Sequence, residues 1–153
     1  DKIKEMLKAK DNNIIEKIDN LKKELSLLKK AKKQDNFKFS SSNVIQSSKY
    51  NCYFDILDSD QKDLKNFSDE IKQRIEKILI ILVSKREKKI SVVVALSKEL
   101  EKDLNAIDIV KKIVFFLGGA GGGGRIDMAQ GGAPFSKKID DLKRFIRTSI
   151  LVI

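Results

Sequence analysis

The sequence predicts an α/β (α+β) fold, in which a small mixed β-sheet is packed by helices and preceded by a long N-terminal helix of coiled-coil type. Three observations predict it. Apolar residues recur at heptad spacing near the N-terminus, two near-continuous apolar runs lie in the middle of the chain, and helical spacing precedes and follows these runs. We expect a helical, coiled-coil-like segment over residues 1–36 and a globular domain over residues 43–153.

The N-terminal segment carries apolar residues at alternating spacings of four and three, the pattern of a helix that packs against another helix. Leu7 falls one heptad before the first of them, and Lys and Glu fill the other faces. The segment is a dimerisation arm, a spacer or a packed helix of an ordinary domain, because it is too short to determine stoichiometry. The candidate dimerisation residues are Ile14, Ile18, Leu21, Leu25 and Leu28.

A polar, serine-rich stretch ends this helix, and the segment "YNCYFDIL" at residues 50–57 has the aromatic and branched residues typical of a strand. Ser59 or Asp60 can then cap a helix. Its apolar positions are Leu64, Phe67, Ile71, Ile75 and Ile78. The next two apolar runs, "KILIILVS" and "KISVVVALS", are typical of strands buried on both faces and joined by the charged turn "KREKK".

A further helix is predicted from about Ser97, and Gly118 stands where a left-handed C-terminal cap is expected. Its apolar side carries Leu100, Leu104, Ile107, Val110, Val114 and Leu117. Ser136 can cap a last amphipathic helix. The inward positions of that helix are Ile139, Leu142, Phe145 and Ile146.

All eight glycines of the chain fall within residues 118–132, which we predict to be an ordered glycine-rich loop between two helices. The pattern G-x-G-x-x-G carries no weight here, because the segment follows a helix instead of a strand. A Walker A loop is excluded because Arg125 and Ile126 follow the last glycine of the run. Backbone amides of Gly121, Gly122, Gly123 and Gly124, followed by Arg125 and Gln130, suit a sugar-phosphate backbone.

The formal net charge of +10 favours a polyanionic partner, with nucleic acid ahead of an acidic membrane surface. Four lysines near the glycine segment are candidate contacts, although a solvated helix face is the alternative for each of them. These lysines are Lys111, Lys112, Lys137 and Lys138. Arg125 has its own alternative, an ion pair with Asp127.

The chain has no histidine and one cysteine, which excludes an internal disulfide and a zinc site of the usual Cys and His type. No catalytic residues or metal ligands are predicted, and Cys52 is expected to pack in a core. No apolar run is long enough to span a membrane and no signal peptide opens the chain, so we expect a cytoplasmic protein without a membrane partner. Because it starts at Asp1 and ends in "SILVI", we expect it to be a piece of a longer protein.

The segment "GGAGGGGRIDMAQGG" resembles the signature GG-x-GGG-R-P-D-M-A-Q-x-GG near the carboxyl end of alanyl-tRNA synthetases. The preceding layout is similar to the carboxyl-terminal part of that family, in which a helical segment leads into a small α/β domain of the type associated with DHH phosphoesterases. This chain departs from the signature in two places. Ile126 replaces the usual proline, which loosens the loop, and Ala120 stands where lysine is often found.

The resemblance implies a tRNA-binding module, with alanine tRNA as the partner and dimerisation through the helical part as a second role. In that family the carboxyl-terminal domain holds the outer corner of the tRNA, so that aminoacylation and editing act on one tRNA. The resemblance implies no cofactor for this segment. It implies ATP, magnesium and zinc for other domains of the longer protein, whose catalytic centres this chain does not contain.

Two further functions are weighed against this one. The chain could be the nucleic-acid-binding half of a DHH-type phosphoesterase, but the related enzymes carry a histidine-containing glycine motif and this chain has no histidine. Alternatively, it could be a dimerisation scaffold in which RNA binding is incidental. Loss of the N-terminal helix would separate the scaffold from an RNA-binding domain, because only the latter would keep its RNA affinity.

Overall fold

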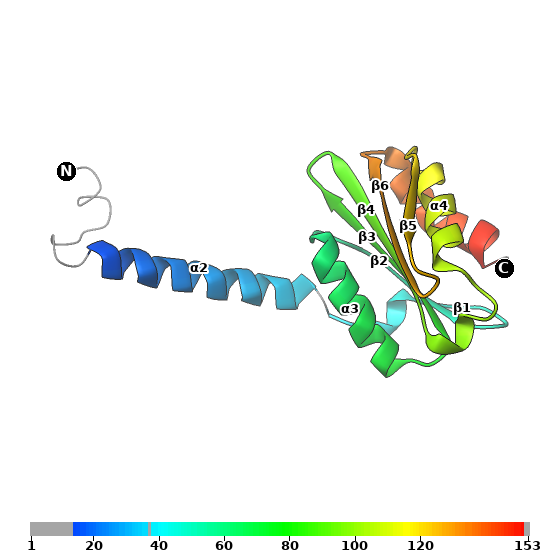
Figure 1. Ribbon diagram of the computed structural model, residues 1–153, viewed down its shortest axis with the longest axis horizontal. Helices are drawn as coiled ribbons and strands as arrows, with labels where there is room; N and C mark the ends of the chain where they lie inside the picture. The colour runs from blue at the N-terminus through cyan, green and yellow to red at the C-terminus, as the bar shows by residue number, and fades with distance from the viewer. Residues whose placement is uncertain (1–13, 37, 152–153) are drawn as a thin grey trace. The chain divides into compact units, whose positions relative to one another are not determined.

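The computed structural model describes residues 14–36 and 38–151. The chain divides into two units between Lys38 and Phe39. The first unit contains the helix α2 (Ile14–Asn36), and the second contains a six-stranded sheet with its covering helices (Figure 1). The mixed α/β fold and the N-terminal helix that the sequence predicts are therefore confirmed.

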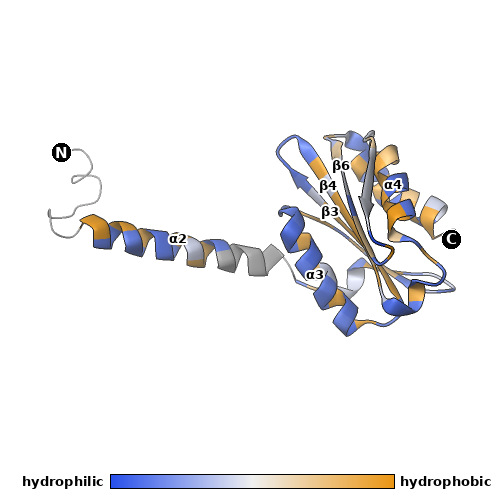
Figure 2. Cartoon of the chain, in the orientation of Figure 1, coloured by the Kyte–Doolittle hydropathy of each residue, from blue (hydrophilic) through white to orange (hydrophobic). Residues whose placement is uncertain are grey.

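The apolar seam of α2 lies open in the single chain. The exposed fraction rises from 36% at Ile18 to 68% at Leu28, and orange apolar positions alternate with blue ones along the helix (Figure 2). Ile14 is half-buried, Leu21 and Leu25 are exposed, and Leu7 lies outside the described residues. A helix with this exposed seam buries little of its own apolar surface, so the described chain does not explain why the seam is apolar.

The sheet is mixed, and its strand order is β1-β2-β3-β4-β6-β5. β2 and β3 run parallel, and every other neighbouring pair is antiparallel. The strands are β1 (Val44–Gln46), β2 (Asn51–Leu57), β3 (Ile78–Arg86), β4 (Lys89–Leu96), β5 (Gly121–Gly124) and β6 (Met128–Pro134). The order places β5 at one edge of the sheet and β1 at the other.

Helices cover both faces of the central strands. α3 (Gln61–Arg74) packs on β3 and β4 from one side, and α4 (Ala106–Phe116) packs on β4, β6 and β5 from the other. Because both faces are covered, the first seven residues of β3 are buried in succession, as the continuous apolar run predicts. Cys52 is fully buried in the core on the α4 side, which confirms its predicted packing role.

Two predicted helix boundaries are wrong. α3 begins as expected after Asp60, whose side chain accepts a hydrogen bond from the Asp63 amide, but it ends at Arg74. Ile75 is only its C-cap, where the backbone is already extended with φ of −135°, and Ile78 opens β3. Between them Lys77 has φ of 48°, so helical geometry does not resume before the strand.

The helix predicted from Ser97 begins later, at Ala106. Asn105 caps it by accepting a hydrogen bond from the Ile107 amide, and Leu100 and Leu104 lie before it in a 3₁₀ turn and its following loop. The predicted end is confirmed, since Gly118 follows the helix with φ of 88°.

The C-terminal segment has the predicted position and inward residues but not a single helical form. Ser136 accepts a hydrogen bond from the Lys138 amide, as predicted for a cap. A 3₁₀ turn (Lys137–Asp141), a short α-helix α5 (Leu142–Phe145) and a π-helical turn (Ile146–Ile150) then follow in succession. Three of the predicted inward side chains are buried and Phe145 is half-buried, so packing against α4 outweighs regular helical geometry here.

Candidate nucleic-acid interface

The glycine-rich segment forms a β-hairpin, not a loop. Gly121–Gly124 is strand β5, which pairs antiparallel with β6 so that Gly121 lies opposite Gly132 and Gly124 opposite Ala129. The prediction of a loop over residues 118–132 is therefore wrong. Glycine has low strand propensity, and the pairing comes from the sheet and α4 rather than from the segment itself.

The glycines allow α4 to lie directly against this hairpin. A Cβ atom added at Gly119 would stand 2.5 Å from Val114 Cγ1, and one added at Gly122 would stand 3.0 Å from Val110 Cγ1 and 2.6 Å from the carbonyl oxygen of Gln130. Any side chain at these positions would force the helix away from the strands. Close approach of α4 therefore explains these two glycines without a ligand.

Part of the β5 backbone faces outward from the sheet. The Arg125 amide donates to the Met128 carbonyl at 2.8 Å, which makes this pair a hydrogen-bonded one. Paired residues alternate between hydrogen-bonded and non-bonded in an antiparallel ladder, so the backbone amides of Gly122 and Gly124 are directed away from β6. Because β5 is an edge strand, these amides lie at the open edge of the sheet, where glycine leaves them unobstructed.

Arg125 lies in the turn of the hairpin and pairs with Asp127. Its Nε atom is 3.2 Å from Asp127 Oδ1, and its Nη2 atom donates to Asp127 Oδ2 at 3.3 Å. The Arg125 side chain is 76% exposed, so the ion pair is solvated and weak. The ion pair with Asp127, which was the alternative role for Arg125, is thus present. The guanidinium stays accessible to an anion that binds it more strongly.

Gln130 points to the opposite face of the sheet from α4. Its neighbours Ala129 and Gly131 are on the face of the sheet that α4 covers. Because side chains alternate between the two faces along a strand, the Gln130 side chain is on the other face. Within the described part of the chain its Oε1 atom is buried without a hydrogen-bond partner. An unpaired buried carbonyl oxygen costs about 1–3 kcal/mol, and no described residue offsets that cost, so an RNA contact by the half-buried Gln130 stays a prediction.

Three of the predicted lysines gather on and beside α4. Lys111 and Lys112 are exposed on its outer side, and Lys138 places Nζ 5.8 Å from the ring centroid of Phe116. Lys111 precedes Val114, which lies against Gly119 and Gly131, by three residues, so its side chain is on the flank of α4 nearer the hairpin. Lys112 precedes Phe116 by one helical turn and lies toward Lys138.

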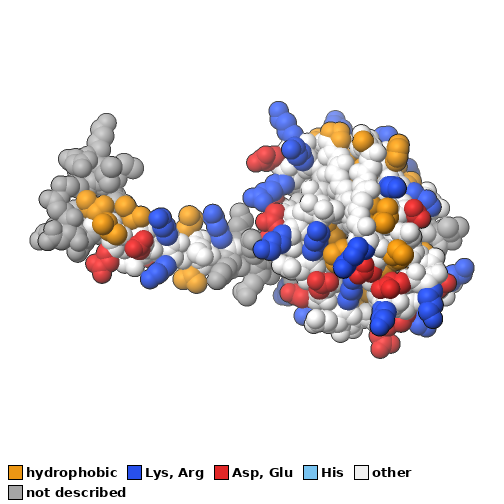
Figure 3. All heavy atoms as spheres, in the orientation of Figure 1, with side chains coloured by type: hydrophobic (Ala, Val, Ile, Leu, Met, Phe, Trp, Pro, Cys, Tyr) orange, Lys and Arg blue, Asp and Glu red, His pale blue; other side chains and the backbone are white. Residues whose placement is uncertain are grey.

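The hairpin separates the remaining predicted residues. Arg125 occupies the turn before β6, whereas Lys137 follows the far end of that strand. Seven strand residues at about 3.3 Å each put roughly 23 Å between the two ends. The predicted contacts therefore line an extended strip along β5 and α4, not a single pocket. On the face seen in Figure 3, Lys and Arg side chains border a white region of backbone and uncharged polar side chains, with acidic and apolar side chains among them.

Sequence reasoning missed two aromatic residues beside these lysines. Phe115 of α4 is 68% exposed, and Phe135, just after β6, is 45% exposed with Lys85 Nζ 5.0 Å from its ring centroid. Phe115 falls outside the apolar stripe of its helix and follows Lys111 by four residues, a signal that the sequence does contain.

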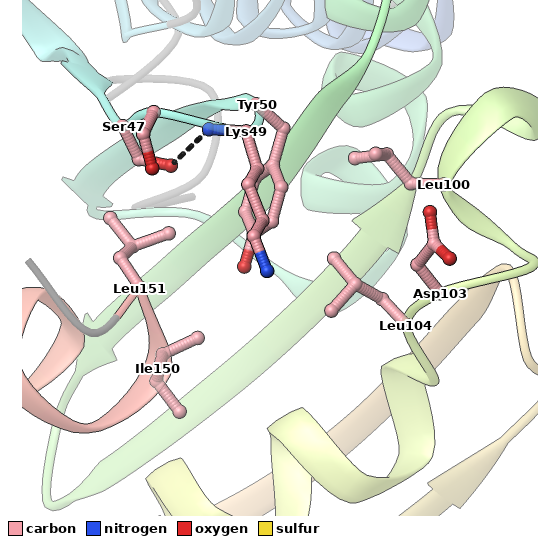
Figure 4. A pocket seen from close by; sticks show the side chains of 9 residues that line it. Ser47, Lys49, Tyr50, Leu100, Asp103, Leu104, Ile150 and Leu151 are labelled. Carbon is pink, nitrogen blue, oxygen red and sulfur yellow. Dashed lines mark hydrogen bonds between the residues drawn. The ribbon is translucent and has the colours of Figure 1, made fainter.

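A cavity of about 610 Å³ lies near the opposite edge of the sheet. Figure 4 shows Lys49 and Tyr50 side by side, facing Leu100, Leu104 and the C-terminal Ile150. Burial, and secondarily the nearby Cys52, raise the pKa of the Tyr50 hydroxyl. None of the predicted site residues lines this cavity.

Two kinds of site are absent from the described residues. Across residues 14–36 and 38–151, no cluster of His, Cys, Asp or Glu has the makings of a metal site. In the same residues, no helix is long and apolar enough to cross a membrane.

Comparison with known proteins connects this hairpin to a family. Residues 49–150, which include β5, β6 and both covering helices, match the DHHA1 domain family. The chain belongs to that family. Its DHHA1 domain is also similar in structure to the crystal structure of the C-Ala domain from Aquifex aeolicus alanyl-tRNA synthetase, with a TM-score of 0.64 and 27% identity over 71% of this chain and 96% of that one.

Sequence relatives agree with the structural match. The chain is 32% identical over 157 aligned positions to an alanine–tRNA ligase of Staphylococcus epidermidis, covering 97% of this chain and 18% of that relative. A second alanine–tRNA ligase, from Paramagnetospirillum magneticum, is 48% identical over 73 positions, or 48% of this chain and 8% of its own length. The chain thus spans less than a fifth of the curated relatives that it matches, and the resemblance that the glycine signature indicated is confirmed.

Proposed function

We propose that this chain is the carboxyl-terminal RNA-binding part of an alanyl-tRNA synthetase, and that the strip along β5 and α4 contacts tRNA. The observation that carries the proposal is the edge position of β5. Its outward amides are at Gly122 and Gly124, and α4, which packs on β5, carries the exposed Lys111. This edge therefore offers backbone donors and a cation, two kinds of group that contact phosphates. Similarity to the C-Ala domain supports the same function.

The charge balance of the strip supports a phosphate partner. Lys111, Lys112, Lys137 and Lys138 form no ion pair with any carboxylate in the described part of the chain, whereas Arg125 is paired with Asp127. Cations without an ion-pair partner gain most from phosphate because no internal ion pair is lost. We therefore assign the main phosphate contacts to the lysines of α4 and give Arg125 a secondary role.

Binding of alanine tRNA by the whole protein would serve aminoacylation and editing, with ATP, magnesium and zinc at sites in other domains. For this part alone we propose salt-sensitive binding that depends on RNA shape, since backbone contacts carry little sequence information. Dimerisation through the exposed seam of α2 is a second proposed role, carried by the apolar residues open along that helix.

The test is the salt dependence of binding to alanine tRNA, another tRNA and an RNA duplex of equal length. We expect Lys111→Ala to lower the slope of log K against log salt by about 0.7–0.9, the value of one lost phosphate contact. Lys62→Ala is the matched control, because Lys62 is an exposed helical lysine on α3, which covers the other face of the sheet. Equal slopes for both variants, or equal binding of all three RNAs, would refute the proposed interface.

A further inference from the structure

A group of phenylalanines and lysines lies on the α4 side of the sheet, toward the C-terminal end of α4. Val114 at this end of the helix is in contact range of Gly119 and Gly131, and β6 then continues to Phe135. Lys85 and Phe135 lie together at this end of the sheet. We call this group the phenylalanine–lysine surface. Its members are Phe115, Phe135, Lys85, Lys111, Lys112 and Lys138.

The two adjacent phenylalanines of α4 have different environments. Phe116 is fixed: its ring stacks on Phe145 with centroids 4.2 Å apart and planes 12° apart, and Lys138 lies over it. Phe115 points outward from the helix and leaves 68% of its area exposed. Packing among the described residues therefore accounts for Phe116 and not for Phe115.

The neighbours of Phe115 indicate the kind of partner. Lys111 and Lys112 precede it by four and three residues, so both lysines lie one helical turn away from it on α4. An apolar protein partner would require these charges to be desolvated, which is costly. An RNA with an unstacked base satisfies both kinds of group, because the base stacks on the ring and the adjoining phosphates meet the lysines.

We propose that Phe115 is a stacking platform for an unpaired nucleobase of the bound RNA, with Phe135 beside Lys85 as a second aromatic contact on the same surface. This inference rests on the proposed RNA-binding function and deepens it. The β5 edge and the lysines then hold the backbone of any RNA, and Phe115 favours RNA that presents an accessible base over a continuous duplex.

The test uses the 153-residue chain, which contains no tryptophan. Phe115→Trp introduces a single fluorophore, and its emission is expected to fall on addition of tRNA because a stacked base quenches it. Lys62→Trp, on α3, is the matched control and should show no quenching. Affinity for tRNA should fall roughly five- to tenfold in Phe115→Leu, which corresponds to the low end of the free energies measured for base–aromatic stacking. In Phe115→Tyr, which keeps an aromatic ring, affinity should stay within about twofold of the parent.

Several outcomes would overturn the proposal. Unchanged affinity in Phe115→Leu would show that aromaticity is not used, and equal losses on tRNA and on the duplex would show that no free base is recognised. A change in sedimentation of Phe115→Leu without a change in RNA affinity would make the surface a protein contact. If Lys111→Ala still lowers the salt slope in any of these cases, the proposed function stands and only the stacking role falls.

Discussion

Gly131 of β6 and Val114 of α4 are in such close contact that a Cβ atom added to the glycine would stand 2.7 Å from Val114 Cγ2. The contact ties the glycine hairpin to the helix that carries the candidate RNA-binding lysines. The position of the β5 edge relative to Lys111 thus depends on a residue without a side chain.

Gly131→Ala is expected to destabilise the domain by about 1–3 kcal/mol, the usual range for overpacking a well-packed interior. Gly123→Ala is the matched control, because no atom lies within 4 Å of a Cβ built there and its φ is not in the left-handed region. Chemical denaturation of the two variants measures the difference. Equal stabilities would show that α4 does not pack this closely on the hairpin.

Gly118→Ala is expected to cost about 1–2 kcal/mol for a different reason. No atom lies within 4 Å of its added Cβ, but its φ of 88° is disfavoured for residues with a side chain. Gly118→Asn should cost less, since asparagine tolerates left-handed geometry better. Thermal unfolding of both variants tests the ranking, and an alanine variant as stable as the parent would contradict the assigned cap.

Asp127→Asn is expected to release Arg125 from its ion pair and to strengthen RNA binding roughly two- to fivefold, since one exposed pair is worth about 0.2–1 kcal/mol. The substitution also removes a negative charge near the proposed phosphate contacts. Filter binding at fixed salt measures the change. The double variant Arg125→Ala/Asp127→Asn should lose the part of the gain that comes from the guanidinium, and weaker binding by Asp127→Asn would show that the carboxylate has a positive role.

Cys52 is expected to resist thiol reagents in the folded protein. Burial raises the pKa of its thiol from 9.0 to about 12, so the reactive thiolate is scarce at neutral pH. Since the folded state keeps the proton that the unfolded state loses above pH 9.0, this group makes the free energy of unfolding fall as the pH rises from about 9 to about 12. Rapid labelling of the single cysteine without denaturant would contradict its burial.

Leu21→Asp is expected to abolish self-association if α2 is a dimerisation helix. Leu21 is 45% exposed in the single chain, so the charge should not unfold the domain. Sedimentation should show twice 17.4 kDa for the parent and 17.4 kDa for the variant. Lys23→Asp, also on α2 but outside the apolar seam, controls for the added charge. A monomeric parent would leave α2 as a spacer.

Long-range pairing explains most of the differences between the predictions and the structure. The run "ILIILV" is identifiable as a buried strand because both of its faces are apolar. Ile78 also fits the helical spacing of the apolar residues in α3. It belongs to a strand because it pairs with Asn51 in the parallel ladder of β2 and β3. The local sequence does not show whether helix formation or strand pairing is more favourable at this residue.

The glycine hairpin shows the same limit at the candidate site. Gly121–Gly124 has no strand propensity, and it is a strand because β6 supplies the ladder and α4 requires the absence of side chains. The family signature was identifiable from its residues alone. The edge position of β5, the separation of Arg125 from Lys137 and the exposure of Phe115 required the fold.

The most direct test of the proposed interface is the response of individual backbone amides to tRNA, measured by NMR. We expect the Gly122 and Gly124 amide signals to shift on titration, together with those around Lys111, while the Ile45 amide in β1 at the opposite edge does not. Shifts confined to α3 or β1, with Gly122 and Gly124 unchanged, would contradict it and place RNA on another surface.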